Sequence, residues 1–197
     1  LIGDGGNSPL GTTTETLKAF KTELNNASKK STAIFLGDNI YQKGLPKKSN
    51  EKRKFAEHQL NVQTGITKAF KGKTIFIPGN HDWYSGGVEG LKRQENYIED
   101  LIGKNTFLPE NGCPIENIHI SDTIELILID SHWYMANWDK NPTINDDCDI
   151  KTRDGFLAEY NSLIKKSRGK TTIVALHHPM YTNGSHGGQF SFGSHMK

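Results

Sequence analysis

The chain has 197 residues, of which 34% are hydrophobic and 23% are charged, and 24 basic against 22 acidic residues leave a formal net charge of +2. This length suits one globular domain with a substantial core. The nearly balanced charge, with lysines scattered in short clusters, argues against the dense basic surface of a nucleic-acid-binding protein. No apolar run is long enough for a membrane-spanning helix.

From the N-terminus onward, the sequence predicts strands that alternate with helices. The expected strands are 1–3, 32–36, 74–77, 118–120, 123–129 and 171–176, with the fourth and fifth forming a hairpin. The expected helices are 13–29, 50–70, 87–102 and 154–166, and a long polar loop covers 137–149. Alternation at this spacing predicts a single α/β domain over 1–197, in which a parallel or mixed sheet is covered by helices.

Apolar residues recur at helical spacing in the first three predicted helices, and these positions are expected to face the core. They are Leu17, Phe20, Leu24, Phe55, Leu60, Ile66, Leu91, Tyr97 and Leu101. The aromatic residues of the segments 83–84 and 133–134 have two open interpretations: they line a substrate cleft, or they pack in the hydrophobic core.

Polar residues follow four of the predicted strands at the point where each strand ends. Asp4 follows the first strand, Asp38 the second, Asn80 and His81 the third, and His177 the last. Ligands bind at the carboxyl ends of strands in open α/β sheets. We therefore expect these side chains to form one metal site with oxygen and nitrogen ligands.

These residue types match the needs of a metal-assisted phosphoester hydrolase. Such an enzyme requires carboxylates that hold cations, with amide oxygens and imidazoles completing the coordination. Asp4 and Asp38 supply carboxylates, Asn80 an amide oxygen and His177 an imidazole. A histidine beside the metals, here His81, can stabilise charge or protonate a leaving group.

Four motifs together resemble the calcineurin-like metallophosphoesterases. They are Asp4-Gly5-Gly6, Gly37-Asp38-Asn39-Ile40-Tyr41, Gly79-Asn80-His81-Asp82 and His177-His178-Pro179. The tyrosine three residues after the second aspartate resembles the purple acid phosphatase branch, including its tartrate-resistant type. The resemblance spans nearly the whole chain and implies a four-layer αββα sandwich with mixed sheets and a dinuclear metal centre.

The resemblance also implies a role for each motif residue. Asp4 would bind the first metal, a ferric ion, to which Tyr41 would supply a phenolate, and Asp38 would bridge the two metals. Asn80 and His177 would bind the second metal, a divalent ion of iron, zinc or manganese.

Three further residues are candidates for catalysis. His81 would act on the reaction without being a ligand, and Asp82 is expected to assist it or to hold the loop. His186 falls where the branch carries a substrate-binding or proton-donating histidine.

The chain departs from the family pattern in one respect. The family ends its site with a Gly-His-x-His motif, which this sequence lacks. Because the first strand also begins at residue 1, we expect the chain to be a fragment of a larger domain, incomplete at both ends, that holds metals with incomplete coordination or loses them.

The leading hypothesis is hydrolysis of a small phosphomonoester. A phosphodiesterase or nucleotide pyrophosphatase on the same site is the alternative, and a non-catalytic binding domain that keeps the fold is the third possibility. Purple acid phosphatases are commonly exported, which favours a periplasmic or secreted protein. Sequence alone leaves open whether Cys113 and Cys148 pair, and it does not give the oligomeric state.

Overall fold

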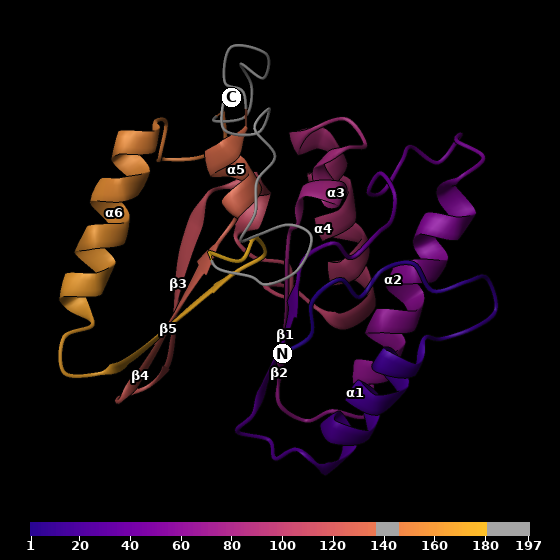
Figure 1. The fold of residues 1–197 in the computed structure, drawn as a ribbon, viewed down its shortest axis with the longest axis horizontal. Helices are drawn as coiled ribbons and strands as arrows, with labels where there is room; N and C mark the ends of the chain where they lie inside the picture. The colour runs from indigo at the N-terminus through magenta and orange to yellow at the C-terminus, as the bar shows by residue number, and fades with distance from the viewer. Residues whose placement is uncertain (137–145, 181–197) are drawn as a thin grey trace, which may run out of the picture.

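The computed structural model describes residues 1–136 and 146–180. Figure 1 shows two sheets lying face to face between two layers of helices. One outer layer is formed by α1 (Glu15–Asn26), α2 (Arg53–Thr67) and α4 (Val88–Ile102). The other is formed by α6 (Arg153–Lys166). The order helix, sheet, sheet, helix confirms the predicted αββα layers.

The first sheet is parallel and is built from β1 (Thr32–Leu36) and β2 (Lys73–Ile77). Single bridges extend it on both sides, Ile2 beside β1 and Phe107 beside β2. Side chains alternate between its two faces. Ile34 packs toward the second sheet, whereas Phe35 lies in the core beneath the helices, stacked 4.0 Å from Phe76.

The second sheet has the order β3-β4-β5. The strands β3 (Ile115–Ser121) and β4 (Ile124–Ile129) pair antiparallel, which confirms the predicted hairpin, and β5 (Thr171–Leu176) pairs parallel to β4. Leu126 and Leu128 lie with Ile34 in the apolar layer between the sheets. The sheet is therefore mixed, as predicted.

Helix boundaries follow local capping. The hydroxyl of Thr14 accepts a hydrogen bond from the Leu17 N–H at the start of α1, and Thr152 accepts from Gly155 N–H at the start of α6. Three short helices were not predicted from the sequence: α3 (Asn80–Trp83), α5 (Ser131–Met135) and the 3₁₀ helix η1 (Glu110–Gly112). Each has five residues or fewer, too short to show helical periodicity.

One predicted core position is wrong. Leu101, at the end of α4, is 44% exposed and lines a cavity between α2 and α4, while Leu91 and Ile98 supply the buried face of this helix. Phe20, Phe55 and Tyr97 are half-buried, and the other expected core residues of the three helices are buried. Of the aromatic residues with two open interpretations, Trp83 and Trp133 lie in the core and Tyr84 is exposed.

Cys113 and Cys148 form a disulfide that joins the segment before β3 to the segment before α6. Within the described ranges, no helix is both long and apolar enough to cross a membrane.

Candidate metal centre

The predicted strand-end residues come together at one edge of the two sheets. Asp38 follows β1, Asn80 begins α3 just after β2, and His177 follows β5. Asp4 follows the extended segment that pairs with β1, and its N–H donates to the Gly37 carbonyl at 3.1 Å. One ligand atom from each of Asp4, Asp38 and His177 lies within 4.8 Å of the others.

Both carboxylates sit on unusual backbone. Asp4 and Asp38 have φ angles of 53° and 52°, in the left-handed region that residues other than glycine seldom adopt. Asp38 is only 4% exposed, and its Oδ1 accepts the His81 N–H at 3.0 Å. A Cβ on Gly79 would lie 2.3 Å from the same Oδ1, so only glycine fits there. Such strain at a polar cluster is typical of functional sites.

The ring of His177 is oriented by the main chain. Its Nδ1 lies 2.8 Å from the Leu36 carbonyl oxygen, which can only accept, so Nδ1 carries the proton. Its Nε2 lies 3.2 Å from Asn80 Oδ1 and 3.4 Å from Asp38 Oδ1, and in the neutral ring it offers a lone pair there. The Asn80 amide is fixed in turn, because its Nδ2 donates to the Tyr84 hydroxyl at 2.8 Å.

This arrangement points several lone pairs at one place. In the neutral ring, Nε2 faces an amide oxygen and a carboxylate oxygen as an acceptor, an arrangement that becomes favourable when a cation or a second ring proton lies between them. Among the described residues, no lysine or arginine forms an ion pair with Asp38 or Asp4. The donor set of carboxylates, an amide oxygen and an imidazole suits iron, zinc or manganese. The residues therefore fit a metal site.

Tyr41 joins the two carboxylates. Its hydroxyl oxygen lies 2.6 Å from Asp4 Oδ1 and 2.8 Å from Asp38 Oδ2, and its single proton is shared between the two carboxylates. Burial, followed by these hydrogen bonds and the negative charge of the two aspartates, raises the pKa of Tyr41 above its ordinary value. A cation lodged among the same oxygens would reverse this balance, because it favours the phenolate.

His81 lies at the margin of the cluster. Its Nδ1 is 2.8 Å from the Gln42 carbonyl oxygen and therefore carries a proton, while Nε2 lies 3.9 Å from Asp38 Oδ2. Its ring lies between those of Tyr41 and Tyr84, at centroid distances of 4.6 and 5.1 Å. The nitrogen that is free to exchange a proton thus faces the carboxylates.

Asp82 is fully buried and its carboxylate holds loops rather than the ring of His81. It accepts hydrogen bonds from the backbone N–H groups of Asn39, Ile40 and Gly79 and from the side-chain amides of Asn39 and Gln94. Burial raises the pKa of Asp82 to about 6, while the N–H donors oppose the shift. This position fits the loop-holding role rather than direct catalysis. His186, the other catalytic candidate, lies outside the described residues.

Three buried glutamines organise the same loops, and the sequence analysis missed them. Gln59 on α2 accepts from the N–H groups of Asn7 (2.6 Å) and Tyr41 (2.8 Å) and donates to the Tyr41 carbonyl (2.7 Å). Gln63, one turn later, donates to the Asn39 carbonyl at 2.8 Å, and Gln94 on α4 donates to Asp82. Gln59 and Gln63 stand at i, i+4 spacing and so lie on the same side of α2, but this spacing alone does not show that the side is buried.

The segment after β4 borders the centre. Asp130 accepts from Trp83 Nε1 at 2.9 Å, and Ser131 Oγ lies 2.8 Å from His178 Nδ1. The His132 ring lies 6.5 Å from that of His178 and 6.0 Å from that of Tyr84. Burial lowers the pKa of His178 to about 4, and the neighbouring His177 and His132 add to the effect, so His178 is neutral near pH 7.

A family model described as calcineurin-like phosphoesterase matches residues 2–196, nearly the whole chain. A search of curated proteins gives no significant match. The family match covers the four strand ends whose side chains converge, and it agrees with the two-sheet fold between helices. The chain belongs to the calcineurin-like phosphoesterase family.

Proposed function

We propose that this protein hydrolyses small phosphomonoesters at a dinuclear metal centre. Its family indicates metal-dependent phosphoester hydrolysis. The observation that carries the proposal is the convergence of Asp4, Asp38 and His177, whose ligand atoms lie within 4.8 Å of one another. The approach of His177 Nε2 to Asn80 Oδ1, at 3.2 Å, strengthens it.

In this proposal one metal, ferric iron, is held by Asp4, Asp38 and Tyr41. The second, a divalent ion of iron, zinc or manganese, is held by Asp38, Asn80 and His177. Bound metals of this kind polarise phosphoryl oxygens and lower the pKa of a coordinated water. The contact of Tyr41 with both carboxylates supports its place as a ligand.

His81 is the residue proposed to move a proton. Because the Gln42 carbonyl holds the proton of Nδ1, exchange takes place at Nε2, which faces Asp38. Protonated at Nε2, the ring can stabilise charge on the phosphoester or give the proton to the leaving oxygen. His186 is proposed to assist in the same way.

We further propose that the protein is periplasmic or secreted and acts on a small phosphoester without a nucleic-acid partner. The Cys113–Cys148 disulfide supports export, because such bonds persist in oxidising compartments. The net charge of +2 supports the absence of nucleic acid.

The test compares p-nitrophenyl phosphate with bis(p-nitrophenyl) phosphate after loading the protein with iron and zinc. The expected result is a higher kcat/KM on the monoester. A higher kcat/KM on the diester would favour the phosphodiesterase instead, and metal binding without turnover of either ester would favour the non-catalytic binding domain.

The iron assignment has its own test. A phenolate bound to ferric iron gives a visible charge-transfer band, which Tyr41→Phe should remove. Tyr84→Phe is the matched control, since Tyr84 contacts Asn80 rather than the carboxylates, and it should keep the band. An active but colourless protein would contradict the ferric assignment and leave the hydrolase proposal standing.

A further inference from the structure

We propose that a cavity beside Tyr41 binds the leaving group of the phosphoester and selects leaving groups that contain an aromatic ring. The cavity has a volume of 570 Å³, within the range of small-molecule sites. The inference rests on the proposed function, because it assigns to the same centre the class of ester that it prefers.

The position of the cavity is set by two tyrosines. Tyr41 and Tyr84 both line it, and their rings flank the ring of His81. The hydroxyl of Tyr41 contacts Asp4 and Asp38, so a single tyrosine ring separates the cavity from the carboxylates. In this proposal, a phosphoryl group at the carboxylates has its ester substituent on the side of Tyr41 and Tyr84 that lines the cavity.

The lining has the chemistry of an aromatic site. Phe55 and Pro46 add apolar surface to the two tyrosine rings, and Tyr84 is 49% exposed, an unusual amount of free aromatic surface. Aromatic rings gain from ring–ring contact beyond the burial of area alone. Lys43 and Lys52 also line the cavity together with Glu51, and the excess of one positive charge favours an anionic substrate.

The wall of the cavity is held in place before a substrate arrives. Arg93 donates to the carbonyl oxygens of Leu45 (3.2 Å) and Ser85 (2.7 Å), and Arg53 donates to that of Pro46 at 2.6 Å. These bonds fix both ends of the lining, the loop after Tyr41 and the loop after Tyr84. A preformed wall lowers the cost of ordering on binding.

The test compares benzyl phosphate with ethyl phosphate on the metal-loaded protein. Both leaving groups are primary alkoxides, so the comparison isolates the ring. We expect a kcat/KM about tenfold higher for the benzyl ester, mostly through KM. The phosphonates that cannot be hydrolysed give a second readout: by calorimetry, benzylphosphonate should bind about tenfold tighter than ethylphosphonate.

Phe55→Ala should remove most of both preferences. Phe20→Ala is the matched control, since Phe20 is also a half-buried phenylalanine on a helix but lies outside the cavity, and it should keep them. Melting temperatures of both variants show whether they are folded at the assay temperature.

The outcomes separate the two proposals. Hydrolysis of both esters without preference, or an equal effect of Phe55→Ala on both, overturns the cavity assignment and leaves the phosphomonoesterase. Tighter binding of benzylphosphonate without turnover of either ester supports the cavity and overturns the hydrolase. If neither ester is turned over and the two phosphonates bind equally, both the cavity assignment and the phosphomonoesterase proposal are overturned.

Discussion

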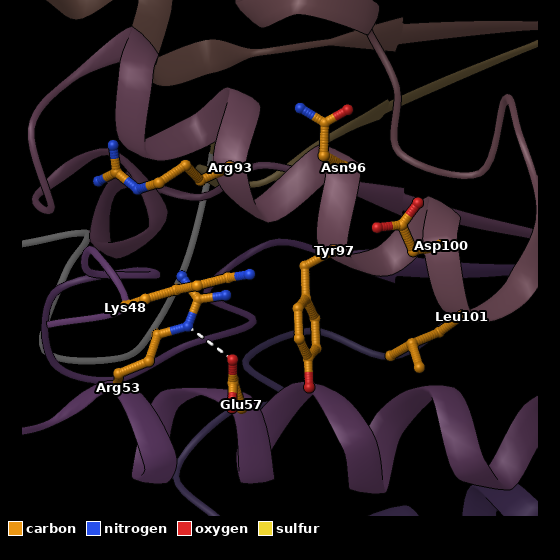
Figure 2. A pocket seen from close by; sticks show the side chains of 8 residues that line it. All are labelled: Lys48, Arg53, Glu57, Arg93, Asn96, Tyr97, Asp100 and Leu101. Atoms are coloured by element: carbon orange, nitrogen blue, oxygen red, sulfur yellow. Dashed lines mark hydrogen bonds and ion pairs between the residues drawn. The ribbon is translucent and has the colours of Figure 1, made fainter.

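Two regions of this protein gather charged and polar side chains, and they differ in how those side chains are paired. In the cavity of 400 Å³ between α2 and α4 (Figure 2), Arg53 donates to Glu57 at 2.7 Å and its guanidinium lies 5.5 Å from the centre of the Tyr97 ring. At the strand ends, by contrast, two carboxylates and an imidazole converge, with one ligand atom from each of Asp4, Asp38 and His177 within 4.8 Å of the others.

The difference separates a structural cluster from a ligand site. Around α2 and α4, the guanidinium of Arg53 meets a carboxylate, a carbonyl oxygen and an aromatic ring, and that of Arg93 meets carbonyl oxygens, so the protein itself supplies partners for both cations. At the strand ends, carboxylates and an imidazole converge without a lysine or arginine partner among the described residues. Neither the size of a cavity nor its number of charged residues tells whether a polar cluster is structural or binds a ligand. The pairing of hydrogen-bond donors and acceptors within the cluster does.

The strongest test of this difference between the two regions is the substitution Asp38→Asn. The substitution removes the carboxylate shared by both proposed metals while keeping its size, so metal binding should be lost and kcat should fall by at least about 10³-fold, consistent with loss of most metal-ion catalysis. Elemental analysis and the monoester assay measure both effects.

Glu57→Gln is the matched control, because it removes one charge from the cavity between α2 and α4. Metal content and kcat should stay within about twofold of the parent, since a partly exposed ion pair contributes less than about 1 kcal/mol. If Asp38→Asn and Glu57→Gln lost the same amount of metal, the distinction between a metal site at the strand ends and a structural cluster between α2 and α4 would be wrong.

A second prediction concerns how far the metal centre depends on α2. Gln59→Leu removes three hydrogen bonds to the loops of Asn7 and Tyr41 and leaves buried backbone groups without a partner. The free energy of unfolding should fall by about 3 kcal/mol, and activity should fall with it because Tyr41 loses its support. Urea denaturation and the monoester assay provide the measurements.

Asn61→Ala, on the exposed side of the same helix, removes a single hydrogen bond to the Tyr97 hydroxyl. It should cost less than about 1 kcal/mol and leave activity unchanged. Similar losses in the two variants would mean that α2 supports the centre only through general stability.

These glutamines also mark where sequence reasoning stops. Asp38 and Asn80 were predictable as neighbours, because the ends of parallel strands in one sheet meet at one edge. His177 follows a strand of the second sheet, so its approach also depends on how the two sheets pack. The contact of Gln59 with Asn7 spans 52 residues and depends on how α2 lies across the sheet. No local pattern records that orientation. From the sequence alone, a buried glutamine cannot be distinguished from an ordinary polar residue on the surface of a helix.

The same limit explains Leu101 and Asp82. Helical spacing places Leu101 near the side of Ile98, but the end of α4 borders the cavity instead of the core, and only packing between helices decides this. The Gly-Asn-His-Asp motif predicts that Asp82 lies near the centre. Its side chain turns away from the carboxylates because α3 directs it at the N–H groups of the loops.

The last prediction concerns a buried acid that has no converging metal ligands around it. Glu95 on α4 is 8% exposed and accepts from the Asn111 N–H at 2.9 Å. Burial raises the pKa of Glu95 to about 7, and Glu99 and Glu110 add to the shift while Lys104 opposes it. Unlike Asp38, this carboxyl is expected to take up a proton rather than a metal.

The sign of the resulting pH dependence follows from this shift. Between the ordinary pKa of a glutamate, 4.5, and about 7, the folded state binds more protons than the unfolded state, so the free energy of unfolding falls as pH rises. The full loss is at most about 3 kcal/mol. Glu95→Gln keeps an acceptor for Asn111 but does not ionise, so urea denaturation from pH 5 to 8 should show a flatter profile than the parent and a more stable variant at pH 8. Asp130 is also buried, with its pKa raised to about 7, so it contributes to the pH dependence of both proteins. The quantity that reports on Glu95 is therefore the difference in unfolding free energy between parent and variant at each pH. A difference that does not change with pH would mean that Glu95 is ionised in the folded state.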